Sequence, residues 1–85
     1  MSKISQVKVI KIAHRDWVGC LYCNSKLIHL LTVDHIVPRA LGGSDKLNNL
    51  SFACRQCNSS KSNMLLTDFI KKYDIKITNK IAKFL

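Results

Sequence analysis

The first part of the chain repeats its apolar residues at a helical spacing. Ile4, Val7, Ile10 and His14 fall on one helical stripe, although the β-branched run VKVIKI also alternates as a strand does. We therefore expect a helix near the N-terminus, with a strand as the alternative.

The middle of the chain has the pattern of a β-hairpin. Residues 26–37 are apolar enough for a strand, and Pro38 with the following ALGGSDKLNN supplies the residues of a long turn. Residues 50–53 then predict a short return strand.

The last third of the chain is predicted to be helical. The polar stretch NSSKSN that follows Cys57 predicts the first turns of a helix. Thr67 before DFIKKY and Thr78 before NKIAKFL are placed as N-caps of two further helices. Residues 66–85 are thus expected to form a C-terminal helical extension.

The size of the chain limits it to one small domain. With 85 residues and 47% hydrophobic content, residues 1–85 are expected to share one core. Such a core supplies only about 3 to 5 kcal/mol, so chains of this size commonly add disulfides, a metal or a partner subunit.

Charge points to a polyanionic partner. Lys and Arg total 14 against five acidic residues, which gives a formal net charge of +9. Basic residues placed on phosphates release condensed counterions, and this favours nucleic-acid binding. The alternative is a basic soluble protein without such a partner. No stretch has the apolar core of a signal peptide or the length of a membrane span, so we expect a reducing cytoplasm.

Two C-x-x-C pairs predict a structural zinc ion. Cys20 and Cys23 form the first pair, Cys54 and Cys57 form the second, and 30 residues separate the pairs. Four thiolates complete a closed tetrahedron with no open position for a substrate. Two disulfides or two free dithiols are the alternative, which a reducing compartment disfavours. Trp17, just before the first pair, and Tyr22, within it, are expected to cover the zinc and the core, or to stack on bases.

The segment between the cysteine pairs holds the candidate chemistry. Asp34 and His35 end an apolar run, where adjacent side chains on a strand point to opposite sides. An isolated Asp-His pair is more often an ordinary strand end. Here, however, Asn49 lies in the same segment and Asn58 directly follows Cys57.

Together these motifs resemble the HNH endonucleases, in their four-cysteine, zinc-binding subtype. The resemblance covers about residues 15–65 and runs through C-x-x-C, DHIVPRALGG, NL and C-x-x-C-N-x-x-K. It implies an α+β domain of the ββα-metal fold, with a two-stranded antiparallel hairpin and a helix stapled by the zinc. It also implies metal-dependent hydrolysis of DNA, as nicking or as double-strand cleavage, in a bacterial or phage-encoded protein.

The resemblance also implies a role for each motif residue. His35 is the general base that takes a proton from the attacking water. Asp34 and Asn58 hold a divalent cation such as Mg²⁺ or Mn²⁺, for which carboxylate and amide oxygens are suitable ligands. Asn49, chosen over its neighbour Asn48 because it directly precedes the leucine of the return strand, belongs to the catalytic set and braces the loop.

Three basic residues close to the motif are candidates for DNA contacts. Lys61, Arg39 and Arg55 are predicted to bind phosphates, and plain solvation is the alternative for each. A chain this small has little room for residues that recognise a DNA base sequence. We therefore expect cleavage that is loosely specific, or that is directed by a second copy or a partner protein. Two other functions stay open: a zinc-bound nucleic-acid-binding module without catalysis, and a zinc scaffold that binds proteins.

Overall fold

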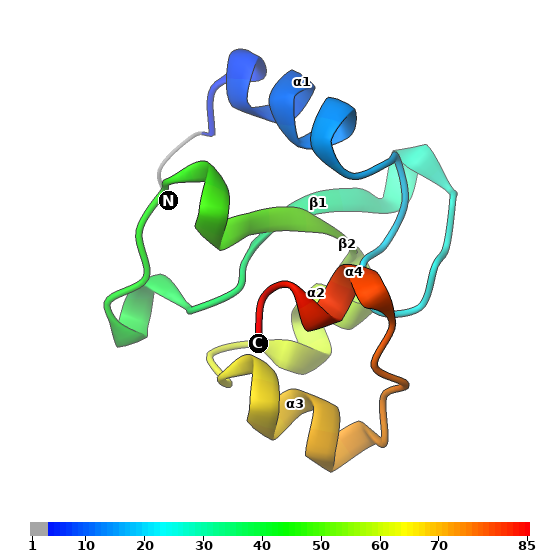
Figure 1. Cartoon of the computed structure of the whole chain (residues 1–85), viewed down its shortest axis with the longest axis vertical. Coiled ribbons are helices and arrows are strands. Elements are labelled where there is room, and N and C mark those ends of the chain that lie inside the picture. Colours follow the sequence, from blue (N-terminus) through cyan, green and yellow to red (C-terminus); the bar gives the residue numbers. More distant parts are fainter. Residues whose placement is uncertain (1–3) are drawn as a thin grey trace.

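An antiparallel pair of short strands forms the centre of the molecule (Figure 1). The computed structural model describes residues 4–85. Strand β1 (Leu31–His35) pairs with β2 (Leu50–Cys54), which sets Leu31 opposite Cys54 and His35 opposite Leu50. The predicted α+β class and the predicted hairpin are confirmed.

The first strand is shorter than residues 26–37. Residues Ile28–Leu30 instead form a single 3-10 turn, η1, and β1 begins only at Leu31. The reason lies in the partner strand, because β2 ends at Cys54 and helix α2 begins at the next residue. Residues 26–30 therefore have no strand with which to pair.

Four α-helices within residues 4–85 surround the hairpin. They are α1 (Gln6–Arg15), α2 (Arg55–Lys61), α3 (Leu66–Tyr73) and α4 (Asn79–Ala82). Helix α1 lies along one side of the hairpin, and the other three gather on the opposite side (Figure 1). None of the helices within residues 4–85 is both long enough and apolar enough to cross a membrane.

The ends of the helices test the predicted caps. The predicted N-terminal helix is confirmed, and the Ser5 side chain caps α1 by accepting from the Lys8 amide. Thr78 caps α4 as predicted, since its hydroxyl accepts from the Ile81 amide at 3.3 Å. The cap at Thr67 is wrong, because α3 begins at Leu66 and takes Thr67 into its first turn.

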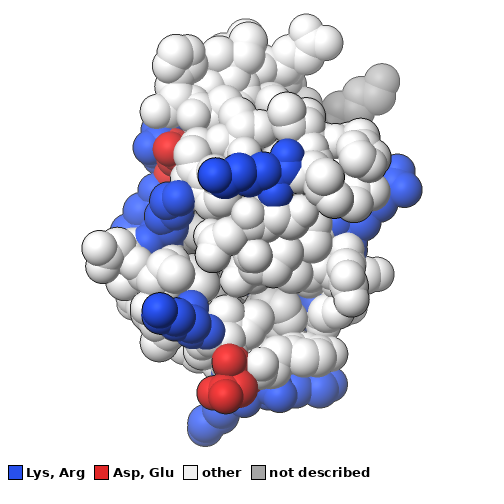
Figure 2. All heavy atoms as spheres, turned by 90° about the vertical axis from the view of Figure 1, so that its right-hand side faces the viewer, with Lys and Arg blue, Asp and Glu red and all other residues white. Residues whose placement is uncertain are grey.

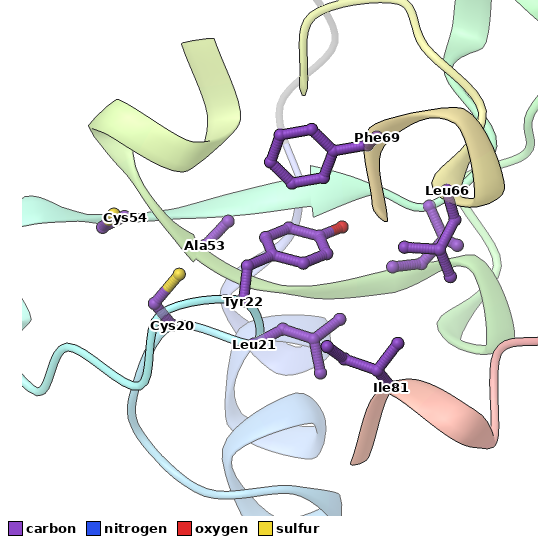
Figure 3. Close-up of a cluster of buried hydrophobic side chains, with 9 residues drawn as sticks. Cys20, Leu21, Tyr22, Ala53, Cys54, Leu66, Phe69 and Ile81 are labelled. Atoms are coloured by element: carbon purple, nitrogen blue, oxygen red, sulfur yellow. The ribbon is translucent and has the colours of Figure 1, made fainter. Parts of the chain in front are cut away.

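The side chains of β2 divide the core into two clusters. Leu50 and Phe52 pack with Ile12 of α1 on one side of the hairpin. On the other side a larger cluster joins the first cysteine pair and β2 to α3 and α4. Its members are Cys20, Leu21, Tyr22, Ile36, Ala53, Cys54, Leu66, Phe69 and Ile81. Tyr22 lies in the middle of this cluster, with Phe69 against its ring (Figure 3).

Polar contacts fasten α1 to the rest of the chain. Arg15 donates to the carbonyl oxygens of Leu47 and Leu50, at 2.5 and 2.6 Å. Asp16 forms ion pairs with Arg15 and with Lys83, beyond the end of α4. Burial alone would raise the pKa of Asp16, but these two cations together lower it. The C-terminal end of α1 is therefore tied both to the hairpin and to the C-terminal segment.

Candidate active site and metal centre

The four cysteines form one cluster with the dimensions of a zinc site. Their sulfur atoms all lie within 4.8 Å of one another, and none of the four forms a disulfide. The Sγ atoms of Cys23 and Cys54 are 3.7 Å apart. A tetrahedral zinc ion with Zn–S bonds of about 2.3 Å requires sulfurs about 3.8 Å apart. The residues fit the metal that the spacing predicts.

Local backbone geometry brings the sulfurs together. The first cysteine pair lies in a tight turn in which Asn24, with a positive φ of 63°, donates its amide to the Cys20 carbonyl. In the second pair the Cys57 amide approaches the Cys54 sulfur at 3.4 Å. Burial and the nearby Cys20 raise the pKa of Cys57, so gathering the thiolates is unfavourable unless a cation compensates their charge.

Asp34 is a buried carboxylate with two partners on one oxygen. Its Oδ2 accepts from the Tyr22 hydroxyl at 2.5 Å and lies 3.6 Å from the Lys61 ammonium. Burial raises the pKa of Asp34, although Lys61 and Tyr22 both favour the ionised form. Tyr22 thus has a role that the sequence did not suggest: its ring packs in the core, and its hydroxyl holds a candidate metal ligand.

Lys61 is placed where a DNA contact cannot be made. The side chain is fully buried, and its ammonium donates to the His35 carbonyl at 2.9 Å. Burial lowers the pKa of Lys61, and the Asp34 carboxylate opposes that shift. The predicted phosphate contact is wrong for this residue, because an ammonium enclosed by protein does not reach a surface phosphate.

Asn58 and Asp34 each have one side-chain oxygen without a hydrogen-bond partner within residues 4–85. On helix α2, the Asn58 side-chain Nδ2 donates to the Thr32 hydroxyl at 2.7 Å. Within residues 4–85, neither the Oδ1 of Asn58 nor that of Asp34 has a hydrogen-bond partner, whereas every buried side-chain oxygen and nitrogen has one. Each of these two Oδ1 atoms therefore keeps some solvent exposure. One carboxylate and one amide oxygen are suitable donors for a hard divalent cation.

His35 has an acidic partner that the sequence did not reveal. Its Nε2 lies 2.7 Å from Oδ1 of Asp45, in the loop between the strands. The two residues are ten positions apart, and no local spacing rule links them. An acidic residue in a loop that follows a candidate histidine was the one available indication.

Asn49 joins the two ends of that loop. Its side chain accepts from the Val37 amide at 2.8 Å and donates to the carbonyls of Val37 and Ser44, at 3.1 and 2.8 Å. Gly43 makes this closure possible, because a Cβ atom there would lie 1.7 Å from the Val37 carbonyl oxygen. Asn49 is buried in the loop. It therefore holds the backbone beside His35 in place.

One cavity brings the candidate residues together. A cavity of about 730 Å³ is lined by Asp34, His35, Asn58 and Arg39, among others. Arg55 is exposed and lines a smaller cavity that also includes Asn58. The four cysteines lie outside both cavities.

The positive charge is not confined to the cavity. On the face seen in Figure 2, which is the right-hand side of Figure 1, Lys and Arg side chains form several separate groups with uncharged areas between them. A surface of this kind has no single basic groove on that face. Arg39 and Arg55, which line the two cavities, stay the candidates for phosphate contacts.

Comparisons with known proteins agree on one family. A family model described as HNH endonuclease matches residues 20–74. The CRISPR-associated endonuclease Cas9 of Actinomyces naeslundii is 39% identical over an alignment of 64 residues, which covers 71% of this chain and 6% of Cas9. The crystal structure of the Type II-C Cas9 enzyme from Actinomyces naeslundii matches with a TM-score of 0.72 at 28% identity, covering 96% of this chain and 9% of that one. The chain thus spans a small part of the relative it matches.

Proposed function

Since the chain belongs to the HNH endonuclease family, we propose that it cuts DNA by hydrolysing phosphodiester bonds. The observation that carries this proposal is the shared cavity, in which Asp34, His35 and Asn58 come together. The net charge of +9 supports a polyanionic substrate. The matched relative is itself described as an endonuclease.

Two open oxygens would hold the catalytic cation. Asp34 and Asn58 are the proposed protein ligands, because each presents an accessible Oδ1 while its other polar atom is occupied. A bound Mg²⁺ or Mn²⁺ would neutralise charge on the scissile phosphate and on the leaving oxygen. Tyr22 and Lys61 fix the Asp34 carboxylate from its other side.

His35 is the proposed general base. A ring nitrogen takes one proton from a water molecule as the water oxygen bonds to phosphorus, and the bond between phosphorus and the 3′ oxygen breaks. The leaving oxygen takes a proton from solvent, which leaves 5′-phosphate and 3′-hydroxyl ends. The Lys61 ammonium and the Asn49 side chain hold the backbone that carries the ring.

The remaining residues bind rather than react. The four cysteines would hold a structural zinc ion, and a set of four thiolates leaves no position for substrate. Arg39 and Arg55 are the proposed phosphate contacts because both line the cavities that contain Asn58. DNA binding is therefore expected to weaken steeply as salt is added.

The test is plasmid nicking by the zinc-loaded protein in Mg²⁺ and in chelator, with wild type and His35→Ala. We expect His35→Ala to bind DNA with unchanged affinity and to cut at least about 10²-fold more slowly. His29→Ala, a change at an exposed histidine in η1, is the matched control and should cut as wild type does.

Two results would overturn the proposal. Cleavage by His35→Ala at the wild-type rate would remove the base assignment. Salt-sensitive DNA binding by the wild type without cutting in any divalent cation would favour the alternative, a zinc-bound nucleic-acid-binding module.

A further inference from the structure

We infer that Asp45 is a positioning residue, which holds the His35 ring by Nε2 and so leaves Nδ1 as the nitrogen that takes the proton from water. This inference rests on the proposed function of His35. It adds a residue outside the predicted motif and assigns the reaction to one atom of the ring.

The contact itself fixes the proton on the ring. His35 Nε2 and Asp45 Oδ1 are 2.7 Å apart, which is a hydrogen-bond distance. An ionised carboxylate only accepts hydrogen bonds, so Nε2 must donate. A neutral imidazole carries a single N–H, and its other nitrogen is then a base with a free lone pair.

The second nitrogen is in a position to react. Within residues 4–85, no group forms a hydrogen bond with His35 Nδ1, and no buried side-chain nitrogen of these residues lacks a partner. Nδ1 is therefore accessible. His35 also lines the cavity shared by Asp34 and Asn58, where the substrate phosphate would lie.

Asp45 is itself held on two sides. Its other carboxylate oxygen, Oδ2, accepts from the Arg39 guanidinium at 3.2 Å. Its backbone carbonyl accepts from the Lys8 ammonium of α1 at 2.6 Å. A carboxylate fixed in this way can orient the ring before substrate arrives, which reduces the ordering required during the reaction.

The neighbouring Arg39 makes Asp45→Asn a sharp test. An asparagine presents one oxygen and one NH₂ group, and Arg39 can only donate. To satisfy Arg39, the amide oxygen must face the guanidinium and the NH₂ group must face the imidazole. His35 Nε2 would then have to accept, which moves the ring proton to Nδ1 and removes the base from the reacting position.

The first measurement needs no DNA. Long-range ¹H–¹⁵N spectra of the zinc-loaded protein, taken under alkaline conditions in which imidazoles are neutral, report which ring nitrogen carries the proton. We expect His35 to be protonated at Nε2 in wild type and at Nδ1 in Asp45→Asn. His14→Gln and His29→Gln proteins assign the other two rings.

The second measurement is the rate of nicking at saturating DNA. We expect Asp45→Asn to lower the turnover rate about 10²- to 10⁴-fold with little change in DNA affinity, as loss of the correct tautomer does in other enzymes. Asp45→Glu keeps a carboxylate at this partly buried position and should recover most of the rate. Asp68→Asn makes the same charge change in the first turn of α3 and should leave both measurements at the wild-type values.

The outcomes separate this inference from the proposed function. A wild-type ring protonated at Nδ1, or an Asp45→Asn protein that turns over at the wild-type rate, overturns the role of Asp45. If the wild type cuts no DNA, the proposed function fails, and the spectrum alone then decides whether Asp45 sets the tautomer. An Asp45→Asn rate loss that Asp45→Glu does not recover would also contradict an orienting carboxylate.

Discussion

The two ends of the hairpin are held together in different ways. At one end, Leu31 pairs with Cys54 beside the four-cysteine cluster. At the other end, His35 pairs with Leu50. There the loop is closed by hydrogen bonds between Asn49 and Val37, between the His35 ring and Asp45, and from Lys61 to the His35 carbonyl. The end that carries the proposed chemistry is therefore the end away from the four-cysteine cluster.

A bound structural zinc ion and any single hydrogen bond of the loop differ in energy by an order of magnitude. Structural zinc sites contribute about 10 to 16 kcal/mol at neutral pH, whereas a single hydrogen bond contributes about 0.5 to 1.5 kcal/mol net. The cysteine end should consequently fail as a unit. The loop end should loosen in steps, one contact at a time.

Loss of the predicted zinc site at the cysteine end has the largest expected effect. Cys54→Ser, or a strong chelator acting on the wild type, should abolish cooperative unfolding, because metal binding and folding share their free energy in such sites. Circular dichroism against urea measures this, and zinc added back should restore only the wild type. A Cys54→Ser protein that unfolds cooperatively would show that the hairpin does not depend on the metal.

Lys61→Met is expected to have the next largest effect. The change leaves the buried Asp34 without its cation and the His35 carbonyl without its donor, which should cost about 3 kcal/mol of unfolding free energy. Lys71→Met, on an exposed position of α3, is the control and should cost less than about 0.5 kcal/mol. Equal stability of the two variants would contradict the buried ion pair.

The same pair of variants also tests the correction made for Lys61. Removing a lysine that contacts a phosphate reduces the slope of log affinity against log salt concentration by about one. For Lys61→Met we expect an unchanged slope of affinity against salt. A reduced slope would return Lys61 to the DNA surface.

Asn49→Ala should have the smallest effect on stability, about 1 to 3 kcal/mol, because it removes side-chain hydrogen bonds from buried partners within one loop. Amide hydrogen exchange should accelerate in residues 36–49 and stay slow in β2. The neighbouring Asn48 is exposed, so Asn48→Ala should change neither the stability nor the rate of amide exchange. If the two variants behave alike, Asn49 does not brace the loop.

Most of the fold could be predicted from sequence patterns that act over a few residues. Cysteine spacing, the turn residues after Pro38 and the cap at Thr78 each act within a few residues, and the structure agrees with them. The first strand was predicted too long because its extent depends on where its partner ends. Nothing within residues 26–30 indicates that β2 stops at Cys54.

The two site contacts that the sequence did not predict, those of Lys61 and Asp45, depend on residues distant in the chain. Lys61 stands in a polar run, NSSKSN, that looks solvated, and it is buried only because α2 packs on both strands. Asp45 meets His35 only because the loop folds back on itself through Gly43 and Asn49. Residue type alone does not reveal either contact.

The alternation of β1 restricts how this chain can change in evolution. Thr32 and Asp34 face α2, where Asn58 and Lys61 meet them, while His35 turns to Asp45. Inserting one residue into β1 would exchange these faces and separate the carboxylate from the cavity it shares with the ring. Insertions between α3 and α4, in residues 74–78, would not change which side chains of β1 face α2. Descendants of this sequence are therefore freer to vary the length of their connections than the length of this five-residue strand.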